Sequence, residues 1–345
     1  MSTKSLKIRL QEGLEGKYSG LKNGLIRINN YIFGTQRGVY YLLGGLSGTF
    51  KTTFCDFWIQ HTLDDAKKRG IECNIFYYSY EIDELSKKCN WLSNAVYRTY
   101  RVVISPETIK GLGDFRMTEE EQKLVYSLVD EVEELMNNIN FRFDACNPTG
   151  IYHELFQFFE SKGTILKEKY TNELGEIKYR ITGYIPNNPN SYTIAILDHA
   201  ALQKKEREFS TKEVIDKLSE YFVVLRNTFK LSVFLIQQFN QGLSSIDRQK
   251  YKGVDISPQH GDFRDSTNPY NDADVVMGLM NPYKLDLETC LGYNVEKLNG
   301  KMLMLKIIKN RLSTDNIAVG LYADPKSGSF SELPEVNKIK YTDYD

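Results

Sequence analysis

Residues 45–52 read Gly45-Leu46-Ser47-Gly48-Thr49-Phe50-Lys51-Thr52, directly after the apolar run 39–45. This stretch resembles the pattern G-x-x-x-x-G-K-[ST], a phosphate-binding loop between a strand and a helix. We expect the helix to run from Thr52 to about Lys68. In such a loop the backbone N–H groups converge on phosphate oxygens at the helix N-terminus. The stretch therefore predicts an α/β fold that binds a phosphorylated ligand.

One position departs from the pattern, because Phe50 stands where the second glycine belongs and Gly48 lies two residues earlier. A side chain there restricts how the backbone turns. Either Gly48 takes up the turn or binding is weakened, and an ordinary glycine-rich turn is the alternative. In the phosphate-loop interpretation, Lys51 reaches the β and γ phosphates of ATP, and the Thr52 hydroxyl ligates Mg²⁺. The expected ATP contacts are Gly45, Ser47, Gly48, Thr49, Phe50, Lys51, Thr52 and Thr53.

Apolar runs alternate with helical patterns along the rest of the chain. Nearly continuous apolar strands between helices predict a mostly parallel sheet covered by helices on both faces. We expect strands at 73–81, 140–146, 193–200, 231–238 and 274–280, with a terminal pair at 302–311 and 316–324. Helices are expected at 83–98, 118–138, 150–162 and 211–229, with a further helix start at Ser105-Pro106-Glu107.

The pattern suggests one core with appendages. Residues 1–22 are polar and are expected to form an arm or linker, the core covers 23–330, and 331–345 form a tail. Within the core, residues 163–192 are charged and then rich in Asn and Pro. They predict an inserted hairpin or loop on the surface.

Composition limits the class of protein. The chain has 345 residues, with 44 Lys plus Arg against 45 Asp plus Glu. This balance excludes a broadly basic surface, so nucleic-acid binding would require locally concentrated cations. Five widely spaced cysteines without a CxxC pair favour reduced thiols over a zinc ribbon. No segment has the apolar length of a signal peptide or a membrane span, so we expect a cytoplasmic protein, in the host cytoplasm if viral.

Two acidic residues end apolar runs and are candidates for the site. Asp198 follows 194–197 and could hold the Mg²⁺ shell, and Glu81 follows 76–80 and could polarise the attacking water. The carboxyl ends of parallel strands face the crevice where ligands bind. Alternatively, Asp198 caps a turn and Glu81 is the first acid of the next helix.

In these motifs and their order, the chain resembles the RecA-like ATPase domain of DnaB-type replicative helicases, especially phage forms, over roughly residues 17–330. Residues 77–81 are similar to the family's strand that ends in a catalytic Glu, here Glu81. Residues 194–198 look like its Walker B strand, with His199 where the family usually has Tyr. Residues 235–240 are similar to its next strand, whose Gln senses the γ-phosphate, and that residue is Gln238 here.

The resemblance extends to DNA and to the neighbouring subunit. Residues 262–266 and 271–276 look like the family's DNA-gripping loop and following strand, which implies DNA contacts from Arg264, Asp265, Ser266 and Thr267. Thr267 replaces a small Gly, so backbone access to phosphate there is in question. Lys309-Asn310-Arg311 looks like the family's K-x-R, whose Lys and Arg reach the neighbour's ATP. From the residues alone, Lys309 and Arg311 would be a solvated edge-strand pair.

The segment 244–265 is long for a connection and carries Arg248, Lys250 and Lys252, so it is either a functional loop or disordered. Together these features predict a ring-forming DNA helicase that uses ATP and Mg²⁺ on single-stranded DNA. The resemblance implies a hexamer, 5′ to 3′ movement, and a primase or loader as a possible partner. The alternatives are a RecA-class recombinase, which forms filaments, and a non-catalytic P-loop protein associated with helicases.

Overall fold

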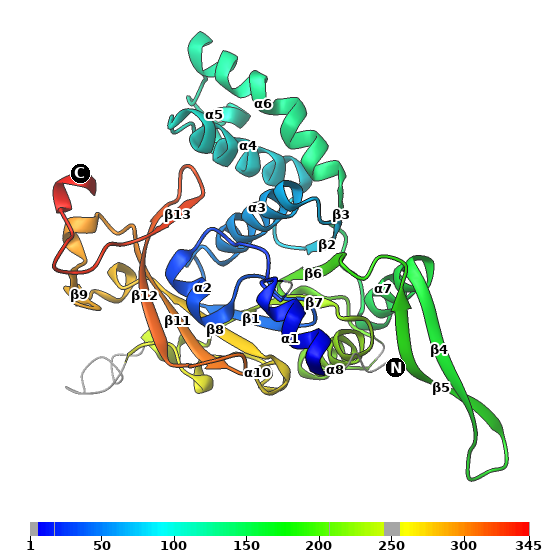
Figure 1. Cartoon of the computed structure of the whole chain (residues 1–345). Helices are drawn as coiled ribbons and strands as arrows, with labels where there is room; N and C mark the ends of the chain where they lie inside the picture. Colours follow the sequence, from blue (N-terminus) through cyan, green and yellow to red (C-terminus); the bar gives the residue numbers. More distant parts are fainter. Residues whose placement is uncertain (1–5, 17, 207, 245–255, 345) are drawn as a thin grey trace.

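A nine-stranded sheet forms the centre of the molecule (Figure 1). The structure is a computed structural model that describes residues 6–16, 18–206, 208–244 and 256–344. The strand order is β13-β12-β11-β8-β1-β7-β6-β2-β3, and the six strands from β8 to β3 are parallel to one another. The strands β11, β12 and β13 add antiparallel to the β8 edge. The predicted α/β class with a mostly parallel sheet is therefore confirmed.

The strands lie close to their predicted positions. Their bounds are β1 Tyr40–Gly45, β2 Cys73–Ser79, β3 Ile139–Arg142, β6 Tyr192–Asp198, β7 Ser232–Gln238, β8 Val275–Met280, β11 Met302–Asn310, β12 Ile317–Asp324 and β13 Ser329–Glu332. The third strand is shorter than expected, because its pairing with β2 stops at Tyr78↔Arg142. Strand β13 and the small pair β9 (Thr289–Cys290) and β10 (Tyr293–Asn294) were not predicted from the sequence.

Helices cover both faces of the sheet. Neighbouring residues of a strand point to opposite faces, so they pack against different helices. Tyr40 and Leu42 pack with helices α7 and α8, whereas Tyr41 and Leu43 pack with α2, α3 and parts of α4 and α6. The helix bounds are α2 Ile26–Ile32, α3 Lys51–Arg69, α4 Glu84–Tyr100, α5 Pro106–Lys110, α6 Glu119–Asn137, α7 Pro148–Lys162, α8 Thr211–Phe229 and α10 Asn268–Asp272.

Local capping explains where several helices begin. Thr118 and Ser210 form capping boxes at α6 and α8, in which the side chain at the cap and a Glu three residues later bond each other's backbone N–H. Asn147 and Ser105 cap α7 and α5, and each is followed by a proline at the first helical position. These caps place the predicted helices close to their expected starts.

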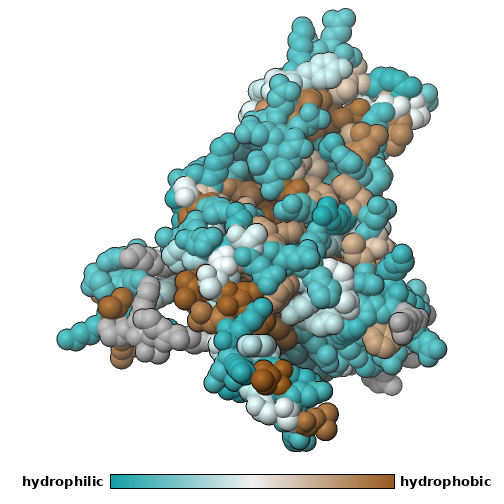
Figure 2. Space-filling view, turned by 90° about the vertical axis from the view of Figure 1, so that its right-hand side faces the viewer, coloured by the Kyte–Doolittle hydropathy of each residue, from teal (hydrophilic) through white to brown (hydrophobic). Residues whose placement is uncertain are grey.

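A two-stranded hairpin projects from the core within the segment 163–192 (Figure 1). Strands β4 (Gly163–Thr171) and β5 (Ile177–Pro186) pair antiparallel with each other. Several apolar side chains on it are exposed, including Leu174, Ile177 and Tyr179. Figure 2 shows hydrophobic residues at the lower tip of this face, among hydrophilic ones, and further hydrophobic patches higher up.

Residues next to the expected limits of the core make backbone contacts with it. Leu21 is buried and exchanges backbone hydrogen bonds with Thr35 in an isolated β-bridge, one residue before the limit at 22/23. The limit at 330/331 falls inside β13. Helix α1 (Leu6–Leu14) has no buried residue. No helix in the described ranges has the length and apolar character needed to cross a bilayer.

Candidate nucleotide site

The predicted nucleotide residues meet at one edge of the sheet. The carboxyl ends of β1, β2, β6 and β7 lie side by side, with Ser79 paired to Asp198 and Gly45 paired to Gln238. The phosphate loop leaves β1 at this edge. Ligands of open parallel sheets bind in the crevice outside these strand ends, so strand order brings the loop, Asp198 and Gln238 to one place.

Phe50 takes up the turn that the sequence pattern assigns to glycine. Its φ and ψ are 59° and 31°, and it directly precedes the first residue of α3, Lys51. Gly48 also has a positive φ, of 69°. Both residues therefore have left-handed backbone, which costs a residue with a Cβ roughly 1–2 kcal/mol. The loop keeps a glycine-like turn at position 50 despite its phenylalanine.

Lys51 folds back over the loop. Its Nζ donates a 2.8 Å hydrogen bond to the carbonyl oxygen of Leu46, which also accepts from Thr49 Oγ1 at 2.8 Å. Lys51 is buried, and this burial lowers its pKa, although Glu81 and Asp198 act in the opposite direction. The lysine thus lies inside the loop, close to two carboxylates.

Asp198 and Thr52 are in direct contact at the site. Thr52 Oγ1 donates a 2.6 Å hydrogen bond to Oδ2 of Asp198, which is fully buried. Burial raises the pKa of Asp198 to about 6. Oδ1 of Asp198 is buried without a hydrogen-bond partner among the described residues. A hydroxyl and an unpaired carboxylate oxygen side by side are hard oxygen ligands, and they fit Mg²⁺.

Two lysines that the sequence analysis did not single out support this site. Lys87 of α4 is fully buried, and its Nζ lies 3.0 Å from both carboxylate oxygens of Asp56 on α3. Lys284, in the short 3₁₀ helix Tyr283–Leu285 after β8, donates a 3.0 Å bond to the carbonyl oxygen of Gly48. A lysine in a polar loop carries no sequence signal that separates it from solubilising lysines.

Gln238 is the last residue of β7, and Glu81 lies just beyond the end of β2. Glu81 is exposed, two residues after the end of β2, and its charge acts on Lys51, Asp198 and His199. The side chain of Gln238 lies beside His199, which follows Asp198. The backbone oxygen of Gln238 accepts a 3.0 Å hydrogen bond from the N–H of Arg264. This hydrogen bond connects the end of β7, where the predicted nucleotide residues meet, to the loop that is expected to bind DNA.

Residues 264–267 form a tight turn that is hydrogen-bonded to a side chain of β7. Gln237 Nε2 donates to the backbone oxygen of Ser266 at 2.8 Å, and Asp265 has a φ of 71°. Ser266 is buried and its hydroxyl donates to Asp216, whereas Arg264, Asp265 and Thr267 are exposed. The expected basic residues Arg248, Lys250 and Lys252 lie outside the described residues.

Lys309 and Arg311 lie near the amino-terminal ends of the parallel strands, on the opposite side of the sheet from the phosphate loop. Asn310 pairs with Val275 at the start of β8, whereas Gly45 pairs with Leu279 near its end. Four residues of strand separate these levels, roughly 13 Å at about 3.3 Å per residue. Within this chain, Arg311 donates to the carbonyl oxygen of Asn271 at 2.8 Å, and Lys309 donates to that of Tyr270 at 2.7 Å.

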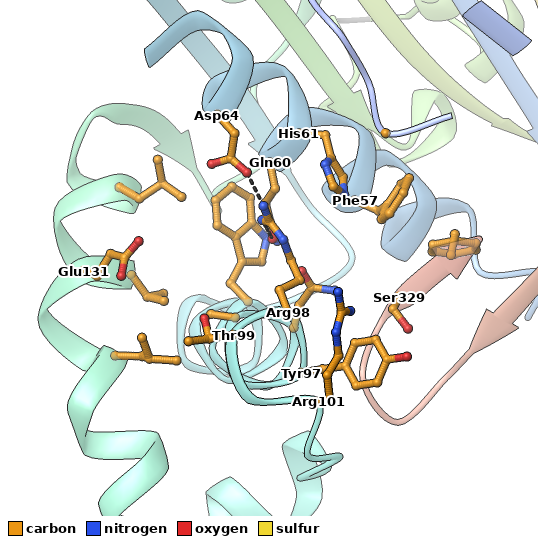
Figure 3. Close-up of a pocket in the computed structure, with 18 residues that line it drawn as sticks. Phe57, Gln60, His61, Asp64, Tyr97, Arg98, Thr99, Arg101, Glu131 and Ser329 are labelled. Atoms are coloured by element: carbon orange, nitrogen blue, oxygen red, sulfur yellow. Dashed lines mark hydrogen bonds and ion pairs between the residues drawn. The ribbon is translucent and has the colours of Figure 1, made fainter. Parts of the chain in front are cut away.

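A cavity of about 490 Å³ lies elsewhere, between α3, α4, α6 and β13, and contains none of the predicted site residues. Figure 3 shows the ion pair of Arg98 with Asp64 on its wall, with His61 and Gln60 nearby on α3. This cavity is therefore separate from the edge of the sheet at which the predicted nucleotide residues meet.

Comparison with known proteins supports the fold. No family model matches the sequence, and no curated protein matches it. Among solved structures, the chain is similar to a DnaB-like replicative helicase studied with primase, with a TM-score of 0.67 and 16% identity over 96% of this chain and 69% of that one. It is also similar to an isolated ATPase domain, with a TM-score of 0.68 and 19% identity over 95% of this chain and 97% of that one. The chain has the RecA-like fold of DnaB-type ATPase domains.

Proposed function

We propose that this protein binds and hydrolyses ATP with Mg²⁺ at the carboxyl edge of its sheet. The observation that carries the proposal is the contact of Thr52 with Asp198, whose second carboxylate oxygen is buried without a partner among the described residues, beside Lys51. A buried polar atom left unpaired is costly, and metal coordination would compensate it. Phosphate at the start of α3 is also favoured by the helix N-terminus.

Each residue then has a distinct chemical role. Thr52 and Asp198 would hold Mg²⁺, which neutralises phosphate charge when bound. Lys51 exchanges its bond to Leu46 for phosphate oxygens. Glu81, exposed at the end of its strand, accepts a proton from the attacking water, and the amide of Gln238 contacts the γ-phosphate.

We further infer that Arg311 and Lys309 act on the ATP of a neighbouring copy. Their place at the edge opposite the phosphate loop keeps them away from the site of their own chain. A cation supplied across a boundary stabilises transition-state charge and makes hydrolysis depend on assembly. We therefore propose a ring, a hexamer as the family resemblance implies.

The DNA part of the proposal rests on Arg264 and Thr267, which are exposed at a turn bonded to Gln238. An exposed arginine such as Arg264 tracks a phosphate backbone without reading sequence, and the hydroxyl of Thr267 adds a neutral hydrogen-bond donor. We propose that ATP hydrolysis moves this loop and pulls single-stranded DNA through the ring, 5′ to 3′, to separate the duplex. A primase or loader partner belongs to the same proposal.

The test measures ATP hydrolysis with and without single-stranded DNA, and unwinding of a forked duplex. Wild type should do both, Lys51→Ala should do neither, and Arg311→Ala should keep ATP binding but lose hydrolysis. Adding Arg311→Ala protein to wild type should inhibit ATP hydrolysis in rings that contain both proteins. Arg116→Ala, which removes an exposed arginine bonded to its own loop, is the matched control. A wild-type chain that stays monomeric with ATP and DNA and cleaves no phosphate would refute the proposal.

Electron microscopy of the same samples addresses the RecA-class alternative. Closed rings on single-stranded DNA support the helicase, whereas continuous filaments support a recombinase.

A further inference from the structure

His199 joins the metal-binding strand to the γ-phosphate sensor. It follows Asp198 at the end of β6, it is buried, and its ring lies next to the side chain of Gln238 at the end of β7. The backbone N–H of Ala201 donates to Nδ1 of the ring at 3.3 Å. Nε2 of the ring lies 3.3 Å from Nε2 of the Gln238 amide. Both ring nitrogens thus have a defined neighbour.

These contacts determine which ring nitrogen carries the proton. Because Nδ1 accepts from Ala201, the neutral ring carries its hydrogen on Nε2. Nε2–H requires an acceptor, and an amide nitrogen is a donor, so two donors would face each other. Turning the amide of Gln238 by half a revolution exchanges its oxygen and nitrogen without moving other atoms. The Nε2–H of His199 then donates to Oε1 of Gln238.

We propose that His199 is a positioning residue that holds Oε1 of Gln238, so that the amide NH₂ group is free to donate to the γ-phosphate. The inference rests on the proposed function and specifies how its sensor is oriented. Gln238 pairs with Gly45, the first residue of the phosphate loop, so its amide lies at the level of that loop. Without the histidine, the amide could offer either its oxygen or its nitrogen, and an oxygen repels phosphate.

Gln238 is also connected to the loop around Arg264 that is expected to bind DNA. Its backbone oxygen accepts from Arg264, and the next residue, Phe239, forms a β-bridge with Phe263. A displacement of Gln238 by the γ-phosphate therefore reaches Arg264 through the main chain. His199 thus also sets how strongly nucleotide state acts on DNA affinity.

The experiment compares His199→Phe with His199→Tyr. Phe keeps a ring but removes the donor, whereas the Tyr hydroxyl can still donate to Oε1. Calorimetry gives the affinities for ADP and for a non-hydrolysable ATP analogue, each with Mg²⁺. We expect His199→Phe to lose about tenfold in preference for the ATP analogue, as for one lost hydrogen bond to a charged group, with ADP affinity unchanged. His199→Tyr should retain the preference.

Two outcomes would overturn the inference. In the first, His199→Phe keeps its preference for the ATP analogue over ADP within about twofold of wild type. In the second, it weakens the binding of both nucleotides equally, as the loss of a merely structural residue would. DNA affinity with and without the ATP analogue is a second readout, and it should lose its nucleotide dependence in His199→Phe alone.

A further measurement does not depend on nucleotide binding. Nitrogen-15 NMR of the histidine rings, with His199→Phe assigning the signal, should show the proton on Nε2, and a proton on Nδ1 would overturn the inference. A wild-type chain that binds no nucleotide would instead refute the proposed function, while this NMR result still decides the orientation.

Discussion

Lys87 places its Nζ 3.0 Å from each carboxylate oxygen of Asp56, and both residues are buried. The hydroxyl of Tyr77 completes the cluster, 3.0 Å from the same Nζ. Asp56 stands one turn after Thr52 on α3, and α4 follows Glu81 closely. The ion pair therefore fixes the helix of the phosphate loop against the segment that carries the proposed base.

Removing one partner of this pair should destabilise the protein strongly. Lys87→Met leaves the carboxylate of Asp56 buried without a counter-charge, with only the hydroxyl of Tyr77 as a hydrogen-bond donor, and we expect a loss of about 3–5 kcal/mol in the free energy of unfolding. The double variant Lys87→Met/Asp56→Leu should recover most of the loss. Urea denaturation measures both. The control is Lys88→Met, next in sequence and partly exposed in a pair with Glu84, which should cost less than about 1 kcal/mol.

Phe50 should be replaceable by glycine but not by alanine. Both variants lose the contacts of the ring, but only glycine relieves the left-handed backbone at φ 59°. Phe50→Gly should therefore be more stable than Phe50→Ala by about 1 kcal/mol, and its ATP affinity should stay near that of wild type. Thermal denaturation and nucleotide titration test this. Equal stability of the two variants would show that position 50 carries no backbone strain.

Lys284 should contribute to phosphate binding, because its ammonium group reaches the carbonyl of Gly48 in the loop. Lys284→Ala should weaken ATP binding about threefold, as expected for one exposed cation. Binding of adenosine, which has no phosphate, should not change. Lys338→Ala, which removes an exposed lysine paired with Glu335 near the C-terminus, serves as the control. An equal loss for adenosine would assign Lys284 a structural role instead.

His61 should make the stability of the protein depend on pH. Burial lowers its pKa from 6.5 to about 4, with Arg98 acting in the same direction. Between these values the unfolded chain binds the proton more readily than the folded one. Stability is therefore full above about pH 6.5 and falls as the pH drops towards 4.

After allowance for partial exposure, this effect amounts to on the order of 2 kcal/mol. In urea denaturation at about pH 7 and about pH 5, His61→Gln should lose less stability on acidification than wild type. His153→Gln, at an exposed position of α7, should follow wild type. An unchanged pH slope in His61→Gln would contradict the prediction.

The local features of this protein could be predicted from short stretches of its amino-acid sequence. The loop at 45–52, the apolar strands and the helix start at Ser105 are each set by residues within a few positions, so their patterns could be read directly. The places of Asp198 and Glu81 after apolar runs made them candidates for the site, and the resemblance then indicated Gln238. Their positions at three strand ends followed from these patterns.

Which side chains contact one another depends instead on how the strands and helices pack. Strand order sets β7 between β1 and β6, and this places Gln238 against both Gly45 and His199. Likewise, Lys87 finds Asp56 and Lys284 finds Gly48 only once helices and strands have packed. Such contacts depend on the sheet topology and on burial, which convert an ordinary lysine or histidine into a partner of the site. A single sequence contains no local signal for them, because the residues involved are far apart along the chain.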